Sequence, residues 1–90
     1  MRELKPHDHI VFTEFDDTEG ILVDLNTKKY YQLNETAVII WKGLKKGLGT
    51  DEIAGEIIAS YEIAFNDARR NVEIIIKELD AYKLIGAKQR

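Results

Sequence analysis

The stretch Tyr30-Tyr31-Gln32-Leu33-Asn34-Glu35-Thr36-Ala37 joins an extended segment to a helix with almost no linker between them. Residues 29, 31 and 33 alternate with residues 28, 30 and 32, which is the period of a β-strand. Asn34 can cap a helix by accepting hydrogen bonds from the backbone of its first turn, and Glu35 places negative charge near the helix's positive end. From Ala37 onward the apolar residues follow a helical period. The strand and the helix are therefore expected to share one core.

The length and composition of the chain predict one small domain spanning residues 1–90. The chain has no cysteine, which excludes disulfides, thiolate metal ligands and thiol catalysis. No apolar run approaches the ~20 residues of a membrane span, and the N-terminus lacks the apolar core of a signal peptide. The net charge of −3 gives no global electrostatic reason to bind nucleic acid. We therefore expect a cytoplasmic protein with neither a membrane nor a nucleic acid as partner.

Three strands are expected in the first half of the chain, after a polar lead-in. The lead-in covers residues 1–8, the strands 10–15, 21–25 and 29–33, and the turns 16–20 and 26–28. Ile21, Val23 and Leu25 fall on one face of the second strand. Because short connections favour antiparallel neighbours, the three strands are expected to form a meander.

Three helices are expected in the second half. The first is expected to stop near residues 43–47, where Gly47 can take a left-handed cap. Thr50 is predicted to cap the second helix, and Asn66 the third, which runs to about Tyr82. Residues 84–85 then form a terminal extended piece before a polar tail. The sequence thus predicts an α+β fold in which a three-stranded antiparallel sheet precedes a three-helix bundle resembling a winged helix-turn-helix.

The third predicted helix has one apolar stripe with helical spacing. Its members are Ala68, Val72, Ile75, Ile76 and Leu79. Ile74 lies well off that stripe. Such an isoleucine either faces a partner or is a single exposed apolar residue of no special significance.

No group of residues predicts catalysis. His7-Asp8-His9 holds both histidines of the chain and could bind a metal, but a solvated polar N-terminus explains it better, since two ligands on a frayed segment rarely hold a metal. Ser60 is the sole serine and has no triad context. No carboxylate has a sequence context that would bury it for acid–base work. We expect no catalytic residue, no metal and no cofactor.

A basic segment on the third helix offers a nucleic-acid alternative. Arg69, Arg70 and Lys77 could contact DNA phosphates as part of a recognition helix. The same helix carries four acidic residues that would repel the DNA backbone, and an ordinary solvated face explains the mixed charge better. These residues are Asp67, Glu73, Glu78 and Asp80.

The third strand is the better functional candidate. In a three-stranded meander the first and third strands are both sheet edges, whose unpaired N–H and C=O groups can accept an added strand. Residues 28–32 give the third strand two lysines and two tyrosines. These residues either bind a peptide, or the lysines protect the edge from aggregation while the tyrosines pack on the helices. Physical reasoning leaves both interpretations open.

Several residues, taken in order and spacing, resemble the PqqD family over residues 21–85. They are Leu33-Asn34-Glu35-Thr36-Ala37, Ile40-Trp41, Gly47, Thr50, Glu52-Ile53-Ala54, Tyr61, Val72, Ile75, Ile76, Leu79 and Leu84-Ile85. PqqD is the coenzyme PQQ synthesis protein D, and its fold is the peptide-recognition element of ribosomally made, modified peptides. The resemblance implies a non-catalytic peptide chaperone that presents a bound precursor to a modifying enzyme, often a radical SAM protein.

The resemblance also implies where a peptide binds. The leader segment of the precursor adds as a strand beside the third strand, in the cleft against the third helix. The matching positions are Lys29, Tyr30, Tyr31, Gln32, Leu33, Arg69, Val72, Glu73, Ile76, Lys77 and Asp80.

Some positions depart from the family pattern. Asn71 stands where the family usually has Asp, Lys83 where it usually has Gly, and Ile74 at a typically polar position. The tyrosines of the third strand are bulkier than the residues common in members of the PQQ pathway. The resemblance thus implies the binding mode rather than the PQQ peptide as ligand. A winged-helix transcriptional regulator is the alternative function, and the chain is expected to be a monomer or a homodimer.

Overall fold

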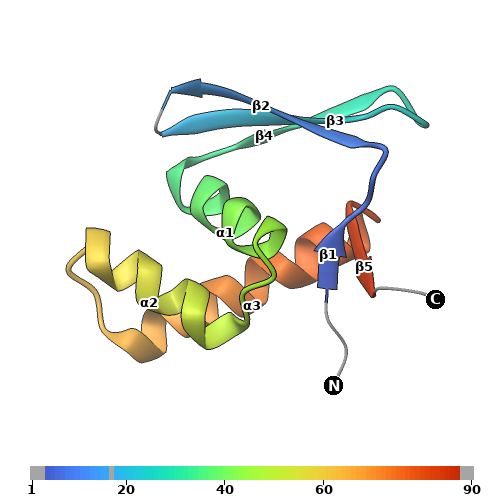
Figure 1. Ribbon diagram of the computed structural model, residues 1–90. Coiled ribbons are helices and arrows are strands. Elements are labelled where there is room, and N and C mark those ends of the chain that lie inside the picture. The colour runs from blue at the N-terminus through green and yellow to red at the C-terminus, as the bar shows by residue number, and fades with distance from the viewer. Residues whose placement is uncertain (1–3, 17, 88–90) are drawn as a thin grey trace.

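The computed structural model describes residues 4–16 and 18–87, and places a three-stranded antiparallel sheet over three helices (Figure 1). The strands are β2 (Ile10–Asp16), β3 (Glu19–Asp24) and β4 (Lys29–Leu33), and the helices are α1 (Glu35–Lys45), α2 (Thr50–Ser60) and α3 (Phe65–Ala81). The strand order is β2-β3-β4, so β2 and β4 are the edges of this sheet. The predicted α+β architecture and meander are confirmed.

The face of β3 that meets the helices differs from the apolar face read in the sequence. Leu22 and Asp24 are buried, at 0% and 4% exposure, and Leu22 is part of the hydrophobic core. Ile21 and Val23 share a face, as predicted, but that face points away from the helices and is half-buried. The predicted turn at residues 16–20 is shorter in the structure because β3 begins at Glu19, and Asp17 lies outside the described residues.

The junction between β4 and α1 forms as the sequence predicts. The Asn34 side chain accepts a hydrogen bond from the backbone N–H of Ala37 at 2.9 Å, so it caps the first turn of α1. Gly47, with φ of 82°, takes the left-handed conformation after the helix ends. The predicted strand and the predicted helix cap thus follow each other directly at this junction (Figure 1).

The predicted caps of the second and third helices are wrong. The N-cap of α2 is Gly49, whose N–H donates to Glu52 Oε1 at 2.8 Å, and Thr50 is the first helical residue. The Glu52 carboxylate, at the third helical position, thus accepts from the backbone N–H of the N-cap residue. This bond takes the place of the side-chain cap expected from Thr50. The helix α3 starts at Phe65 because the Ala68 N–H already donates to the Ala64 carbonyl at 3.0 Å. Asn66 therefore lies inside the first turn.

The core is centred on α1, between the sheet and the other two helices. Trp41 and Ile40 of α1 are 1% and 0% exposed. On α3, three members of the predicted stripe are buried and two are half-buried, while Ile74 is 48% exposed, as its off-stripe position predicts. The buried members are Ala68, Val72 and Leu79, and the half-buried ones are Ile75 and Ile76. No helix in the described part of the chain has the length and apolar character of a membrane span.

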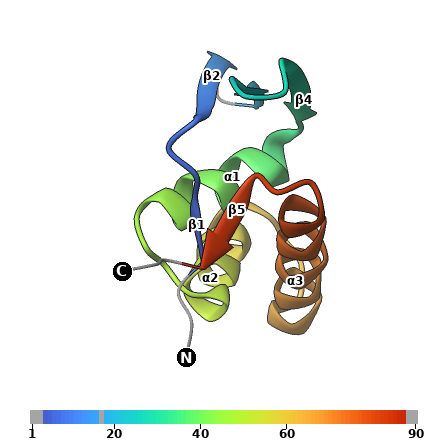
Figure 2. The same ribbon diagram turned by 90° about the vertical axis from the view of Figure 1, so that its right-hand side faces the viewer.

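The two ends of the chain form a second, two-stranded sheet that the sequence analysis missed. β1 (Leu4–Pro6) pairs antiparallel with β5 (Ile85–Ala87), beside α3 (Figure 2). The next residue, His7, donates its N–H to the Leu84 carbonyl at 3.2 Å and stacks its ring on that of His9. The expectation that the polar lead-in is frayed is thus wrong for β1 and His7. A pairing between distant segments leaves no local sequence pattern, whereas the extended character of residues 84–85 was predicted.

Candidate functional site

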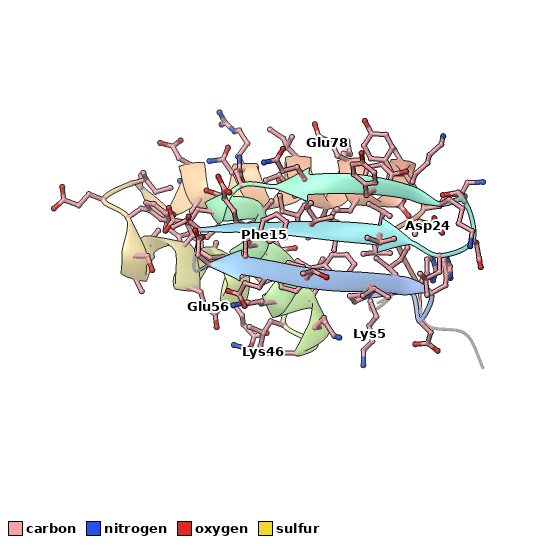
Figure 3. The ribbon with its side chains drawn as sticks, turned by 90° about the horizontal axis from the view of Figure 1, so that it is seen from above. Lys5, Phe15, Asp24, Lys46, Glu56 and Glu78 are labelled. Carbon is pink, nitrogen blue, oxygen red and sulfur yellow. The ribbon has the colours of Figure 1, made fainter. Side chains whose placement is uncertain are left out.

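A cleft of about 330 Å³ opens between β4 and the C-terminal half of α3. Its lining residues are Tyr31, Gln32, Leu33, Asn34, Ala37, Ile75, Glu78, Leu79, Tyr82 and Leu84. Most are apolar, and one is a carboxylate, Glu78, which Figure 3 shows beside β4. The strand and cap residues come from the stretch that joins β4 to α1, so one short segment of sequence builds one wall of the cleft.

The middle strand β3 shows which backbone groups of the sheet are already paired. The Leu25 N–H donates to the His9 carbonyl at 3.0 Å, toward the β2 side. The Asp24 carbonyl accepts from the Lys28 N–H at 2.8 Å, toward the β4 side. Because residues of a central antiparallel strand alternate between their two neighbours, Leu22 also bonds toward β4.

This alternation identifies the free groups on β4. The register pairs Leu22 with Tyr31 and Gly20 with Leu33, so Tyr31 and Leu33 use their backbone groups within the sheet. The backbone groups of Tyr30 and Gln32 therefore point to the open edge. An extended peptide placed there would pair with these two residues.

The other edge of the sheet is less suited to an added strand. β2 has a bulge between Glu14 and Asp16, which interrupts the regular ladder. The Glu14 carboxylate is also bound by Lys42 Nζ of α1 at 2.7 Å. β4 has a regular register along its length and is the edge on the same side as α3 (Figure 2). Of the two edges, β4 is thus the candidate for strand addition.

Two tyrosines meet at one end of the cleft. The rings of Tyr31 on β4 and Tyr82 after α3 have centroids 5.2 Å apart, with planes tilted by 36°. Tyr82 is held there because the chain turns sharply at Lys83, whose φ is 63°, and the Leu84 N–H donates to the Leu79 carbonyl at 2.9 Å. The aromatic contact links the strand to the helix across the cleft.

The β3–β4 hairpin that positions this edge is held by Asp24 (Figure 3). Its carboxylate accepts the N–H groups of Asn26 at 2.9 Å and Thr27 at 3.1 Å, and His9 Nε2 lies 3.9 Å away. Burial raises the pKa of Asp24, but the two N–H bonds and the nearby His9 together outweigh it, so the pKa lies below the ordinary value. The carboxylate therefore stabilises the hairpin when it is ionised.

This lowered pKa predicts acid sensitivity of the hairpin. A carboxyl with a depressed folded-state pKa stabilises the fold above its unfolded pKa, and the contribution disappears as pH falls through the folded pKa. We expect the thermal midpoint to fall between about pH 5 and about pH 2. Asp24→Asn, which keeps an acceptor but cannot titrate, should weaken this pH dependence, whereas Glu62→Gln in the exposed α2–α3 connector should leave it intact. Equal pH profiles for the wild type and Asp24→Asn would contradict the assignment.

The predicted helix residues lie outside this cleft. Arg69 Nε binds Asp51 Oδ1 at 2.6 Å, and Arg69 Nη1 binds Glu73 Oε2 at 3.0 Å, so Arg69 joins α2 to α3. Val72 is fully buried at 0% exposure. Glu73, Ile76 and Lys77 line a second hollow of about 390 Å³, together with Thr50, Arg70 and Ile74. Asp80 is exposed.

The pitch of α3 explains why the predicted helix residues lie outside the cleft. Successive residues are about 100° apart, so Ile75 and Ile76 lie on opposite flanks of the buried line through Val72 and Leu79. The cleft residues of α3 and its C-cap have the spacing i, i+3, i+4, i+7 and comprise Ile75, Glu78, Leu79 and Tyr82. The sequence shows this spacing, but it does not show which flank of the stripe faces the sheet. That the residues on the other flank of α3 bind a peptide stays a prediction.

Residues 19–85 match the family model described as coenzyme PQQ synthesis protein D (PqqD). The chain belongs to the PqqD family. The resemblance predicted over residues 21–85 is thus confirmed. A comparison with curated protein sequences finds no significant match.

Two solved structures of similar fold support this membership. TbiB1 in complex with the TbiA(beta) leader peptide is 27% identical with a TM-score of 0.85, over 96% of this chain and 99% of that chain. Lasso peptide synthetase B1 complexed with the leader peptide is 25% identical with a TM-score of 0.83, over 93% of this chain and 98% of that chain.

Proposed function

We propose that this PqqD-family protein is a non-catalytic binding module that captures the leader segment of a ribosomally made precursor peptide and presents it to a modifying enzyme. The observation that carries the proposal is the open edge of β4 beside an apolar cleft. Both solved structures similar to this chain are complexes with leader peptides. The enzyme partner would be a peptide-modifying protein such as a radical SAM enzyme, and synthesis of the precursor on ribosomes would place both in the cytoplasm.

The binding mode follows from the two parts of the site. The leader would add as a strand beside β4 and pair its backbone with Tyr30 and Gln32, within the predicted segment Lys29–Leu33. Backbone pairing is nearly independent of sequence, so the side chains that enter the cleft must set the specificity. Alternate residues of an added strand would point into the cleft toward Ile75 and Leu79. These positions favour apolar side chains in the leader.

A catalytic role is not part of the proposal. Strand pairing uses backbone N–H and C=O groups, and the cleft offers one carboxylate and two phenols, from Tyr31 and Tyr82. The role proposed for these groups is contact with the peptide. The two histidines are likewise not used, and the described residues contain no group of three or more His, Cys, Asp or Glu residues placed to hold a metal ion.

The winged-helix alternative predicts DNA binding through α3. Arg69, one of the three basic residues that favoured this interpretation, is paired with Asp51 and Glu73, whose carboxylates would repel a phosphate. We expect no sequence-specific duplex binding at physiological salt, because acidic residues are interleaved along α3. Fluorescence anisotropy with labelled duplexes would measure this. Sub-micromolar, sequence-dependent binding would favour the transcriptional regulator instead.

Amide-shift mapping by NMR tests the proposed function directly. The titrant is the leader peptide of a precursor encoded beside this gene, and the scrambled leader is the control. The largest shifts are expected on β4 and on the cleft face of α3, at Ile75, Glu78 and Tyr82. Perturbations centred on β2, or on Arg69 and Lys77 at the other flank of α3, would place the peptide elsewhere.

A further inference from the structure

The outer face of the sheet is not covered by the described helices. In Figure 1 all three helices lie beneath the sheet, and Figure 3 looks down on the open face. The register aligns Val11, Val23 and Tyr30 in one row across the three strands. Val11 and Tyr30 are 42% and 73% exposed. This face therefore presents an apolar row to its surroundings.

A second row lies beside the first and has no charge either. It aligns Thr13, Ile21 and Gln32 across β2, β3 and β4. Phe15, at the bulge of β2, adds an exposed ring at 57%. In a chain with 32% charged residues, six neighbouring uncharged positions on an open sheet form an unusual surface. The cores of protein interfaces are likewise depleted in charged residues and enriched in aromatic ones. We define these two rows as the outer face.

The outer face is too small to hold a permanent partner. Three strands about 4.8 Å apart, each about five residues of ~3.3 Å long, cover roughly 240 Å² in projection. A stable interface buries about 800 Å² on each partner. Self-association through this face alone is thus disfavoured by area, and a transient contact with a different protein fits better.

A peptide strand added to β4 would extend this same face. Its backbone would lie beside Tyr30 and Gln32, the two residues that end the outer rows on β4. Because side chains of a strand alternate between its faces, those not in the cleft would continue the two rows by one further position each. The loaded sheet therefore has a larger outer face than the free one, and that face contains part of the leader.

We propose that the outer face, completed by the bound leader, is the surface on which the modifying enzyme docks through an uncharged, apolar patch of its own. This inference rests on the proposed function. The enzyme would contact the domain and the leader together, and so recognise the loaded form. The side chains of the leader that enter the cleft would stay buried during this contact. One face of the leader strand would thus bind this domain, and the opposite face would contact the enzyme.

The test compares two exposed apolar positions of similar exposure. Val11→Glu puts a charge on the outer face at the edge strand farthest from β4, and Ile74→Glu puts one on α3 at a residue that is 48% exposed, against 42% for Val11. Affinities for the leader, and of the loaded domain for the modifying enzyme encoded beside the precursor, are measured by isothermal titration calorimetry. Thr13→Glu is a second outer-face variant, should Val11→Glu fail to fold.

We expect Val11→Glu to weaken enzyme binding by about tenfold or more, because its carboxylate would lose water in an apolar contact, with leader affinity unchanged within about twofold. Ile74→Glu should change neither, and the wild type should bind the enzyme more weakly without leader. The inference would be overturned if both outer-face variants kept the enzyme affinity of the wild type. It would also be overturned if the wild type bound the enzyme equally well with and without leader. A dimer in sedimentation equilibrium that Val11→Glu dissociates would overturn it as well. Failure of the wild type to bind any leader would instead refute the proposed function.

Discussion

Replacing Tyr30 with proline should abolish leader binding while the domain stays folded. The Tyr30 N–H points to the open edge of β4, so its loss removes a donor to the added strand without breaking a bond within the sheet. The proline ring would also protrude toward the incoming peptide backbone. We expect a loss of affinity of about 100-fold or more, measured by calorimetry with the leader peptide.

Tyr31→Pro is the matched control for that variant. Tyr31 uses its backbone groups to pair with Leu22, so proline there removes a ladder bond from the sheet itself. An unmade bond of this kind costs about 1–3 kcal/mol, or a fall in thermal midpoint of roughly 4–24 °C. Circular dichroism melts distinguish the two effects. If Tyr30→Pro melts like Tyr31→Pro, or still binds the leader as the wild type does, the deduced direction of the N–H groups is wrong.

Ile75→Asp should produce the second large effect. Ile75 lines the cleft between β4 and α3, where an apolar leader side chain is proposed to insert. A carboxylate there would have to lose water when the peptide binds, so we expect about 100-fold weaker binding. The added charge also lies near Glu78, which strengthens the effect for any leader without a basic residue at that position.

Ile76→Asp is the matched control, because Ile76 is the next residue along α3 and is half-buried, as Ile75 is. Ile76 faces the second hollow on the other flank of α3. Its replacement should reduce stability to a similar degree and leave leader affinity within about threefold. Loss of binding in Ile76→Asp with none in Ile75→Asp would instead support the helix face that the family resemblance implies, with Arg69 and Lys77 at its rim.

The sequence by itself determined the parts of this protein that depend on near neighbours. The alternation in residues 29–33, the capping side chain of Asn34 and the glycine at position 47 act over a few residues, and each has the predicted structure. The order and spacing of such local features also identified the family. These features placed the open edge strand, which is half of the candidate site.

Only the tertiary structure decided which faces of these elements meet. Ile75 and Ile76 are equally apolar and adjacent, and docking of α3 against α1 and α2 determines that Ile75 enters the cleft while Ile76 does not. On β3, helices on one side bury Leu22 and leave Ile21 and Val23 on the outer face, although hydrophobicity by itself favours burial of Ile21 and Val23. The pairing of β1 with β5 joins the two ends of the chain. Such contacts depend on the relative placement of distant segments, which local propensity and periodicity do not encode.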